Sequence, residues 1–261
     1  MMNLTNKYIP ILLFENKGCY LKKYLEEYLI NIVCTEANKP CKKCVWCSKI
    51  INNGYYDLIH VYPHNNVIRK QEIIDIQNKF NNTALESRGI KIYIIHQIEK
   101  ANKESLNSLL KFLGEPKDNT IGILTTRKPY GVLDTIVSRC VRYSTNSYEE
   151  KVEFKNKYKP KELELIKIMF YSYDDILQYE STKDIFKLLE LIHLLELNNK
   201  KFDQIIKIRD LFEKIDYYEI SLVLNYLIFT GDFKRKSKLI PILNNLNLNL
   251  SKNAILISII D

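Results

Sequence analysis

Four cysteines lie close together in the stretch "CTEANKPCKKCVWC". They are Cys34, Cys41, Cys44 and Cys47, and the last three form two overlapping C-x-x-C spacings. Such spacings let neighbouring thiolates converge on one ion, and the loop through Pro40 returns Cys34 as a fourth ligand. Four sulfur ligands are typical of tetrahedral zinc, with bonds of about 2.3 Å. We predict a structural zinc site, because four protein ligands leave no open position for a substrate water.

Other states of these thiols stay open: disulfides, an iron–sulfur cluster, or thiols without a ligand. Disulfides are disfavoured in a reducing cytoplasm, and nothing else in the sequence indicates redox chemistry. Lys39, Lys42 and Lys43 lie alongside in the sequence and would offset the negative charge of four thiolates. The two remaining cysteines, Cys19 and Cys140, stand alone, and we expect them to be ordinary small apolar residues.

A second stretch that could do chemistry is "GIKIYIIHQIEK", residues 89–100, which reads as a buried strand running into a turn. In many nucleotide-hydrolysing folds such a strand delivers an acidic pair to a magnesium-bound triphosphate. Here the strand ends in His96 and Gln97, which can neither hold a magnesium shell nor polarise water in the usual way. Glu99 is close in the sequence, but we place it in the turn beyond the strand.

A phosphate-binding loop after the first strand would read G-x-x-x-x-G-K-[S/T], with glycines for close backbone approach and a lysine and hydroxyl for charge and magnesium. The corresponding stretch is "LLFENKGCYLKKY". It keeps only Gly18, Lys17 precedes that glycine, and Cys19 stands where the lysine would be. Departures at both chemical positions predict a nucleotide-hydrolase core without its reaction, and we expect this chain to bind no ATP.

The elements that would position these residues alternate between strand and helix patterns over the first 145 residues. The apolar runs "IPILLF", "DLIHVYP", "IKIYII", "TIGILTT" and "CVRYS" are typical of strands, and amphipathic helical patterns separate them. This alternation predicts an α/β domain with a parallel sheet covered by helices. After Thr145 the patterns are helical. We expect three domains: 1–146 (α/β, with the cysteine module at 34–47), 147–183 (small helical domain) and 184–261 (helical C-terminal domain).

Composition bounds the class of protein and its partners. The chain has 261 residues, of which 46% are hydrophobic and 27% charged, as in globular proteins with real cores. Its net charge of +8 suits an anionic partner such as nucleic acid but does not identify one. There is no apolar run of roughly 18 residues and no signal-peptide cleavage pattern, so we expect a cytoplasmic protein.

In their order along the chain, these features resemble the bacterial DNA polymerase III clamp-loader subunits of the AAA+ class, and most closely the delta-prime subunits. The resemblance covers roughly residues 9 to 145. It implies an AAA+ type domain with a zinc-binding insert, a small helical lid and an all-α, collar-like C-terminal domain. The residues that carry it are the cysteine cluster, "IRKQEIIDIQNKF", "IYIIHQIEKANKESLNSLLKFLGEP", "IGILTT" and "VLDTIVSRCVRY".

The resemblance also implies a role for the triplet Ser138, Arg139 and Cys140. In that family the arginine of "SRC" reaches across a subunit interface to the ATP held by a neighbour. Arg139 would therefore be a trans-acting arginine finger that places a guanidinium against developing γ-phosphate charge. A surface arginine or a local ion pair is the alternative. Thr126 matches the family's sensor position at the end of "IGILTT".

Together these features imply a delta-prime-like subunit that is not an enzyme by itself. It would join ATP-binding motor subunits and the delta subunit in a hetero-oligomer that loads the sliding clamp on primed DNA during replication. Zinc would be its cofactor, and no membrane would be involved. One alternative is a divergent gamma/tau-like motor subunit that hydrolyses ATP, and another is a stand-alone zinc-dependent DNA-binding module. The helical tail after Thr182 is shorter than a full collar domain would need.

Overall fold

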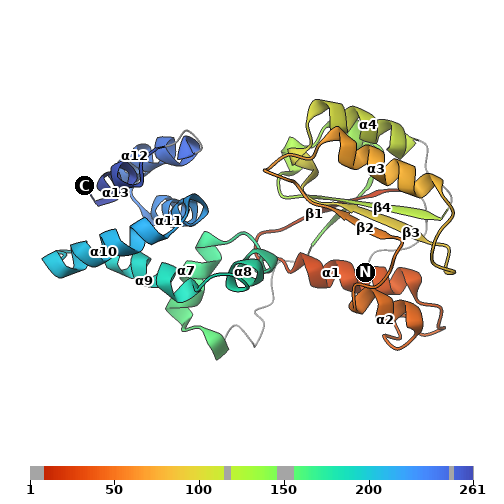
Figure 1. Ribbon diagram of the computed structural model, residues 1–261, viewed down its shortest axis with the longest axis horizontal. Coiled ribbons are helices and arrows are strands. Elements are labelled where there is room, and N and C mark those ends of the chain that lie inside the picture. Colours follow the sequence, from red (N-terminus) through yellow and green to blue (C-terminus); the bar gives the residue numbers. More distant parts are fainter. Residues whose placement is uncertain (1–8, 115–118, 146–155, 247–249, 261) are drawn as a thin grey trace. The chain divides into compact units, whose positions relative to one another are not determined.

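The computed structural model describes residues 9–114, 119–145, 156–246 and 250–260 (Figure 1). The chain forms two compact units, residues 1–147 and 148–261. The first holds every site residue predicted from the sequence. Within the described ranges, no helix combines the length and the apolar composition that are needed to cross a membrane.

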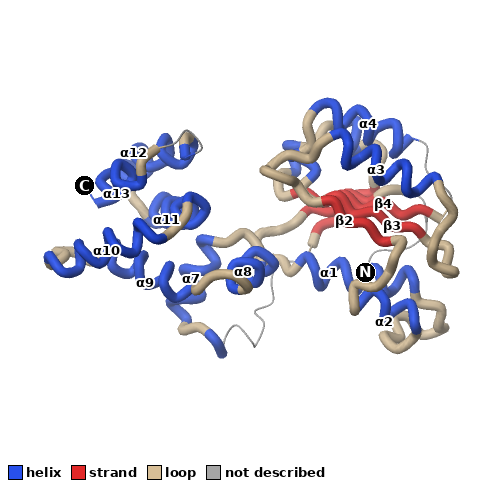
Figure 2. Tube along the Cα trace, in the orientation of Figure 1, coloured by secondary structure: helices blue, strands red, loops and turns tan. Residues whose placement is uncertain are grey.

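The first unit is built on a five-stranded parallel sheet (Figure 2). The strand order is β2-β3-β4-β1-β5, and it confirms the parallel sheet expected from the alternating patterns. The carboxyl ends of β1, β3 and β4 therefore meet at one edge of the sheet. The strands are β1 (Ile11–Phe14), β2 (Leu58–Val61), β3 (Lys91–Ile95), β4 (Thr120–Thr126) and β5 (Val141–Ser144).

Helices cover both faces of this sheet, which is why its central strands are apolar almost without interruption. In β1, Ile11 and Leu13 belong to one core, whereas Leu12 belongs to the core on the other face. Figure 1 shows α1 and α2 on one face and α3 and α4 on the other. The helices of this unit are α1 (Leu21–Val33), α2 (Val45–Ile51), α3 (Lys70–Asn81), η1 (Ile98–Lys100), α4 (Lys103–Gly114), η2 (Pro129–Gly131) and α5 (Asp134–Val137).

The described part of the second unit is helical, as expected. Its helix α11 is apolar almost all round and packs against α7, α9 and α12. The helices are α7 (Pro160–Met169), α8 (Tyr173–Glu180), α9 (Ile185–Glu196), α10 (Phe202–Lys214), α11 (Tyr217–Thr230), α12 (Phe233–Asn244) and α13 (Lys252–Ile260).

A buried carboxylate joins the expected lid to the expected collar within this second unit. Glu219 on α11 accepts hydrogen bonds from the hydroxyl of Tyr179 on α8 (2.6 Å) and from the ammonium of Lys183 (2.8 Å). Both partners lie before the expected boundary at 183/184, and Glu219 lies after it. The structure groups all of these helices in one compact unit. The separation into lid and collar therefore stays a prediction.

Candidate functional site

The loop between β1 and α1, where a phosphate-binding loop would lie, is a tight turn formed by residues 15–20. The backbone N–H of Cys19 donates to the carbonyl of Asn16 (3.0 Å), and Gly18 takes a left-handed conformation with φ of 79°. The backbone N–H of Asn16 donates to the hydroxyl of Thr145 beyond β5 (2.9 Å). A phosphate-binding loop instead points its N–H groups at the ligand. Lys17 is exposed.

A buried carboxylate occupies the end of β1. Glu15 is 4% exposed, and its Oε2 accepts a charged hydrogen bond from Nε of Arg127 (2.9 Å). The hydroxyl of Thr125 donates to Glu15 Oε1 and accepts from the backbone N–H of Gln97 (3.1 Å). The backbone N–H of Arg127 donates to Glu99 Oε1 (3.2 Å). These bonds link the carboxyl ends of β1, β3 and β4, and we call Glu15, Gln97, Glu99, Thr125 and Arg127 the edge network.

The edge network fills the strand ends at which a hydrolase would hold its triphosphate. Glu15 presents negative charge there, which repels phosphate, and Arg127 is already paired with it. The expected sensor residue, Thr126, is not in the network, because its hydroxyl exchanges hydrogen bonds with the backbone of Lys128 (3.1 and 3.2 Å). Sequence reasoning missed Glu15, Thr125 and Arg127. An acidic residue directly after the first apolar strand was the one available signal.

His96 is buried beside this network, 5% exposed, at the end of β3. Its Nε2 lies 3.0 Å from Nδ1 of His60, and the ring of Tyr62 stacks on it with 4.1 Å between centroids. Burial, with smaller contributions from the neighbouring His60 and Arg127, lowers the pKa of His96 to about 3. Burial also lowers the pKa of His60. His96 is therefore a neutral imidazole that shares a hydrogen bond with His60, and it carries no negative charge for a magnesium ion.

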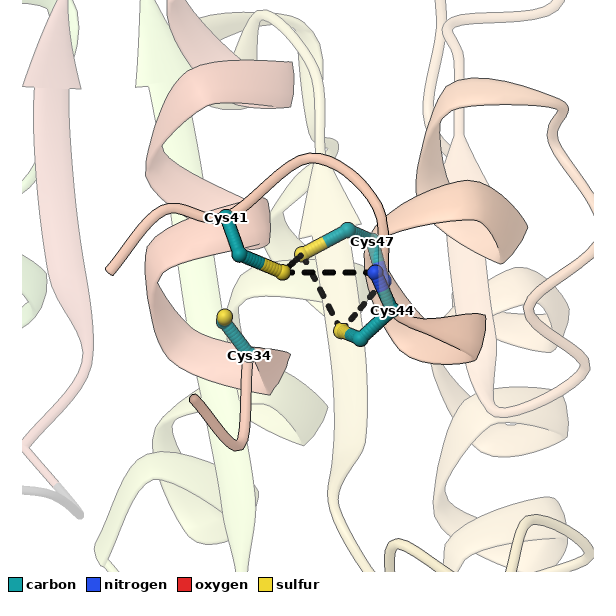
Figure 3. A group of neighbouring side chains, drawn as sticks. All are labelled: Cys34, Cys41, Cys44 and Cys47. Atoms are coloured by element: carbon teal, nitrogen blue, oxygen red, sulfur yellow. Dashed lines mark hydrogen bonds between the residues drawn. The ribbon is translucent and has the colours of Figure 1, made fainter. Parts of the chain in front are cut away.

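The four cysteines of the sequence motif meet between α1 and α2, and Figure 3 shows their sulfur atoms turned toward one another. All four sulfurs lie within 4.8 Å of one another. The sulfur of Cys47 is 3.8 Å from that of Cys41 and 3.4 Å from that of Cys44. Four bonds of about 2.3 Å in a tetrahedron require sulfur–sulfur distances of about 3.8 Å. The donor set and its spacing therefore fit a tetrahedral tetrathiolate ion site.

Backbone amides favour thiolates in this cluster. The N–H of Cys44 donates to the sulfur of Cys41 (3.3 Å), and the N–H of Cys47 donates to the sulfur of Cys44 (3.5 Å). The second bond is the main reason why the pKa of Cys44 is lowered to about 6. Burial raises the pKa of Cys47 to about 12, and a cation at the centre would favour its thiolate form. The lysines expected to offset charge, Lys39, Lys42 and Lys43, are exposed around the loop.

The triplet of Ser138, Arg139 and Cys140 connects α5 to β5. Cys140 is half-buried against the α3–α4 core, and burial raises its pKa to about 12, as expected of an apolar-like cysteine. Arg139 is exposed, and its Nη1 donates to the carbonyl of Thr135 (2.8 Å). The structure therefore places an exposed guanidinium on an anchored connection. It does not bring Arg139 into the edge network.

The buried state of His96 predicts a pH dependence of stability. The unfolded chain binds a proton at this residue below about pH 6.5, whereas the folded chain does so near pH 3. The stabilisation of the folded state by a neutral His96 is therefore fully present above about pH 6.5. It is lost as the pH falls from there toward 3, because the unfolded chain takes up the proton first. In urea unfolding between pH 7 and 5, His96→Gln should flatten the fall in unfolding free energy by up to about 1.4 kcal/mol per pH unit. The exposed His64→Gln is the control, and parallel curves for His96→Gln and the unchanged chain would contradict the assignment.

Comparison with known proteins gives the family. The profile described as "DNA polymerase III, delta subunit" matches residues 3–148, more than half of the chain. DNA polymerase III subunit delta' of Bacillus subtilis is 41% identical over 102 residues, which cover 39% of this chain and 31% of that protein. DNA polymerase III subunit tau of the same organism is 34% identical over 115 residues, 44% of this chain and 20% of that protein. The chain thus spans about a third of the one relative and a fifth of the other.

Two further matches extend over the whole chain. The "Uncharacterized protein MG007 homolog" of Mycoplasma pneumoniae is 26% identical over 262 residues and covers all of both chains. The crystal structure of a DNA polymerase III, gamma subunit-related protein from Thermotoga maritima superposes with a TM-score of 0.65 at 18% identity, covering 98% of this chain and 94% of that one. That structure supports the fold, and the profile match supports the resemblance seen in the sequence. The chain belongs to the family of the DNA polymerase III delta subunit, among bacterial clamp-loader proteins close to delta'.

Proposed function

We propose that the chain is a non-hydrolysing, delta-prime-like subunit of a DNA polymerase III clamp loader. It assembles with ATP-binding motor subunits and a delta subunit, and the complex loads the sliding clamp on primed DNA. The family match and the delta' relative support the complex. The observation that carries the non-hydrolysing role is the edge network, which occupies the strand ends that a triphosphate would need.

Binding of ATP at this edge would require several unfavourable changes. The ion pair between Glu15 and Arg127 would have to open, and separating a buried pair costs on the order of 3–5 kcal/mol. The turn at residues 15–20 would have to release the amide of Cys19 from Asn16. Cys19 stands directly after Gly18 where a phosphate-binding loop has its lysine, so no lysine at that position offsets these costs by binding the β- and γ-phosphates.

Arg139 has the properties that a trans-acting arginine requires. Its side chain is exposed, and reaching a neighbour's γ-phosphate costs one hydrogen bond to the carbonyl of Thr135. Its backbone is anchored on both sides: its own N–H donates to the preceding carbonyl of Ile136 (3.1 Å), and the following Cys140 packs against the α3–α4 core. A planar guanidinium that is always charged suits the three equatorial oxygens of a transferring phosphoryl group.

We further propose that the cysteine cluster holds one structural zinc ion. Cys34 directly follows α1 and Cys47 lies in α2, so a shared ion would fix the insert to the main body of the domain. Zinc supplies four strong bonds where a short insert has little core of its own. Cys34 and Cys47 are fully buried, which excludes water from two of the four ligands.

Replacing one ligand tests the zinc proposal. Cys44→Ser should reduce bound zinc from about one equivalent to a small fraction and lower the melting temperature, because three thiolates no longer close the tetrahedron. Zinc content by elemental analysis and melting with and without a chelator are the measurements. Cys140→Ser, outside the cluster, should keep its zinc. Full zinc content and unchanged melting in Cys44→Ser would defeat the proposal.

Replacing the arginine tests the trans-acting role. In a reconstituted loader, Arg139→Ala should lower DNA-stimulated ATP turnover and clamp loading about tenfold or more, since such arginines contribute large factors to phosphoryl transfer. Its melting temperature should not change, because the side chain is exposed. Arg142→Ala, an exposed arginine on β5, is the matched control. Equal ATP turnover in loaders that contain the unchanged chain, Arg139→Ala or Arg142→Ala would show that Arg139 takes no part in the reaction.

The second candidate is a divergent motor subunit, and the match to tau is the observation that favours it. Equilibrium binding of labelled ATP to the isolated chain separates the two functions. The edge network predicts no binding in the micromolar range, with or without magnesium. Micromolar affinity together with magnesium-dependent turnover would establish the motor function and refute the non-hydrolysing one.

A further inference from the structure

Helix α12 and the segment that follows it up to residue 260 carry positive charge and contain no acidic residue of their own. The chain has 31 acidic residues, yet none lies in the range 233–260. The last acidic residue before it, Asp232, caps α12 by accepting the backbone N–H of Arg235 (2.8 Å). The cations of this range are Lys234, Arg235, Lys236, Lys238 and Lys252.

Two of these lysines share one exposed face of α12. Lys234 and Lys238 are one helical turn apart, and within the described part of the chain neither ammonium group forms an ion pair or a hydrogen bond. Like charges four residues apart on a helix repel each other, so this arrangement costs helix stability. Leu239 is fully buried and holds the other side of α12 in the core. The face of α12 that carries Lys234 and Lys238 is therefore held toward solvent. A bound anion would offset the repulsion between these two lysines.

Two aromatic rings are exposed beside these lysines. Phe229 in the last turn of α11 is 64% exposed, and Phe233 in the first turn of α12 is 86% exposed. The turn between them is tight at Gly231, where a Cβ would lie 2.7 Å from the carbonyl of Leu227. The tight turn keeps the end of α11, which carries Phe229, at the start of α12, where Phe233 directly precedes Lys234. Large exposed rings interleaved with cations are typical of surfaces that contact both bases and phosphates.

We propose that Phe229, Phe233, Lys234 and Lys238, which we call the α12 surface, bind single-stranded nucleic acid. The lysines would neutralise phosphates and Phe233 would stack on an unpaired base. This inference goes beyond the proposed function, since it assigns a nucleic-acid contact to the second unit itself.

Binding of a fluorescein-labelled dT20 oligonucleotide to the full-length chain, followed by anisotropy over a series of KCl concentrations, tests the proposal. The double variant Lys234→Gln, Lys238→Gln should weaken binding about tenfold and make the salt slope less negative by about 1.4, at roughly 0.7 per lost phosphate contact. Its melting temperature should stay the same or rise, because the repulsion on α12 is gone. If the two lysines only stabilised the fold, the double variant would melt at a lower temperature and bind dT20 with unchanged affinity and salt slope.

Phe233→Ala should weaken binding about tenfold while the salt slope stays unchanged, because stacking releases no counterions. The double variant Lys161→Gln, Lys187→Gln removes the same charge from exposed lysines elsewhere in the unit and should bind like the unchanged chain. Equal losses in both lysine variants would show that net charge alone binds the oligonucleotide. Binding to phosphatidylserine vesicles, polyglutamate or duplex DNA in preference to dT20 would also overturn the proposal.

Discussion

The ion pair between Glu15 and Arg127 is the interaction on which the carboxyl edge of the sheet depends. The carboxylate side chain is 1% exposed, so without its partner it would remain as an uncompensated buried charge. The pair joins β1 to the segment that follows β4, and Thr125 extends the connection to the backbone of Gln97 after β3. In a nucleotide-hydrolysing core, a bound triphosphate and its magnesium make contacts to these same strand ends. Here side chains make them, so the order of this edge requires no nucleotide.

The sequence alone was sufficient to predict those features that depend on residues close together in the chain. The C-x-x-C spacing places Cys44 and Cys47 at the start of α2, where residues three apart face the same point, and the loop before α2 brings Cys41 and Cys34 to them. Apolar runs located the strands, and the end of β3 placed His96 and Gln97 correctly. Local sequence patterns did not establish whether the helical half divides into a lid and a collar. Its helices are all apolar on the faces that pack, and the contact between Tyr179 and Glu219 crosses the expected boundary.

The edge network could not be predicted from the sequence, for two physical reasons. Glu15 and Arg127 are 112 residues apart, and only the order of strands in the sheet makes them neighbours. The choice between Thr125 and Thr126 depends on which face of β4 each side chain takes, and a shift of one residue reverses the faces. In a strand buried on both sides, such as "IGILTT", hydrophobic alternation does not reveal the face. The register of Leu13 with Thr125 resolves it.

The edge network and the exposed Arg139 are connected through the same strands. Preorganised charge stabilises a transition state best when no reorganisation is needed at the moment of reaction. Arg139 lies two residues before β5, which pairs with β1 along its whole length, and Glu15 directly follows β1. A motor subunit exchanges the ligand at this edge during each cycle, whereas under the proposed function the edge network would keep its contacts. Under the proposed function, losing its own nucleotide chemistry therefore removes a source of motion from the strand that supports Arg139, and a neighbour's ATP meets a guanidinium on a constant scaffold.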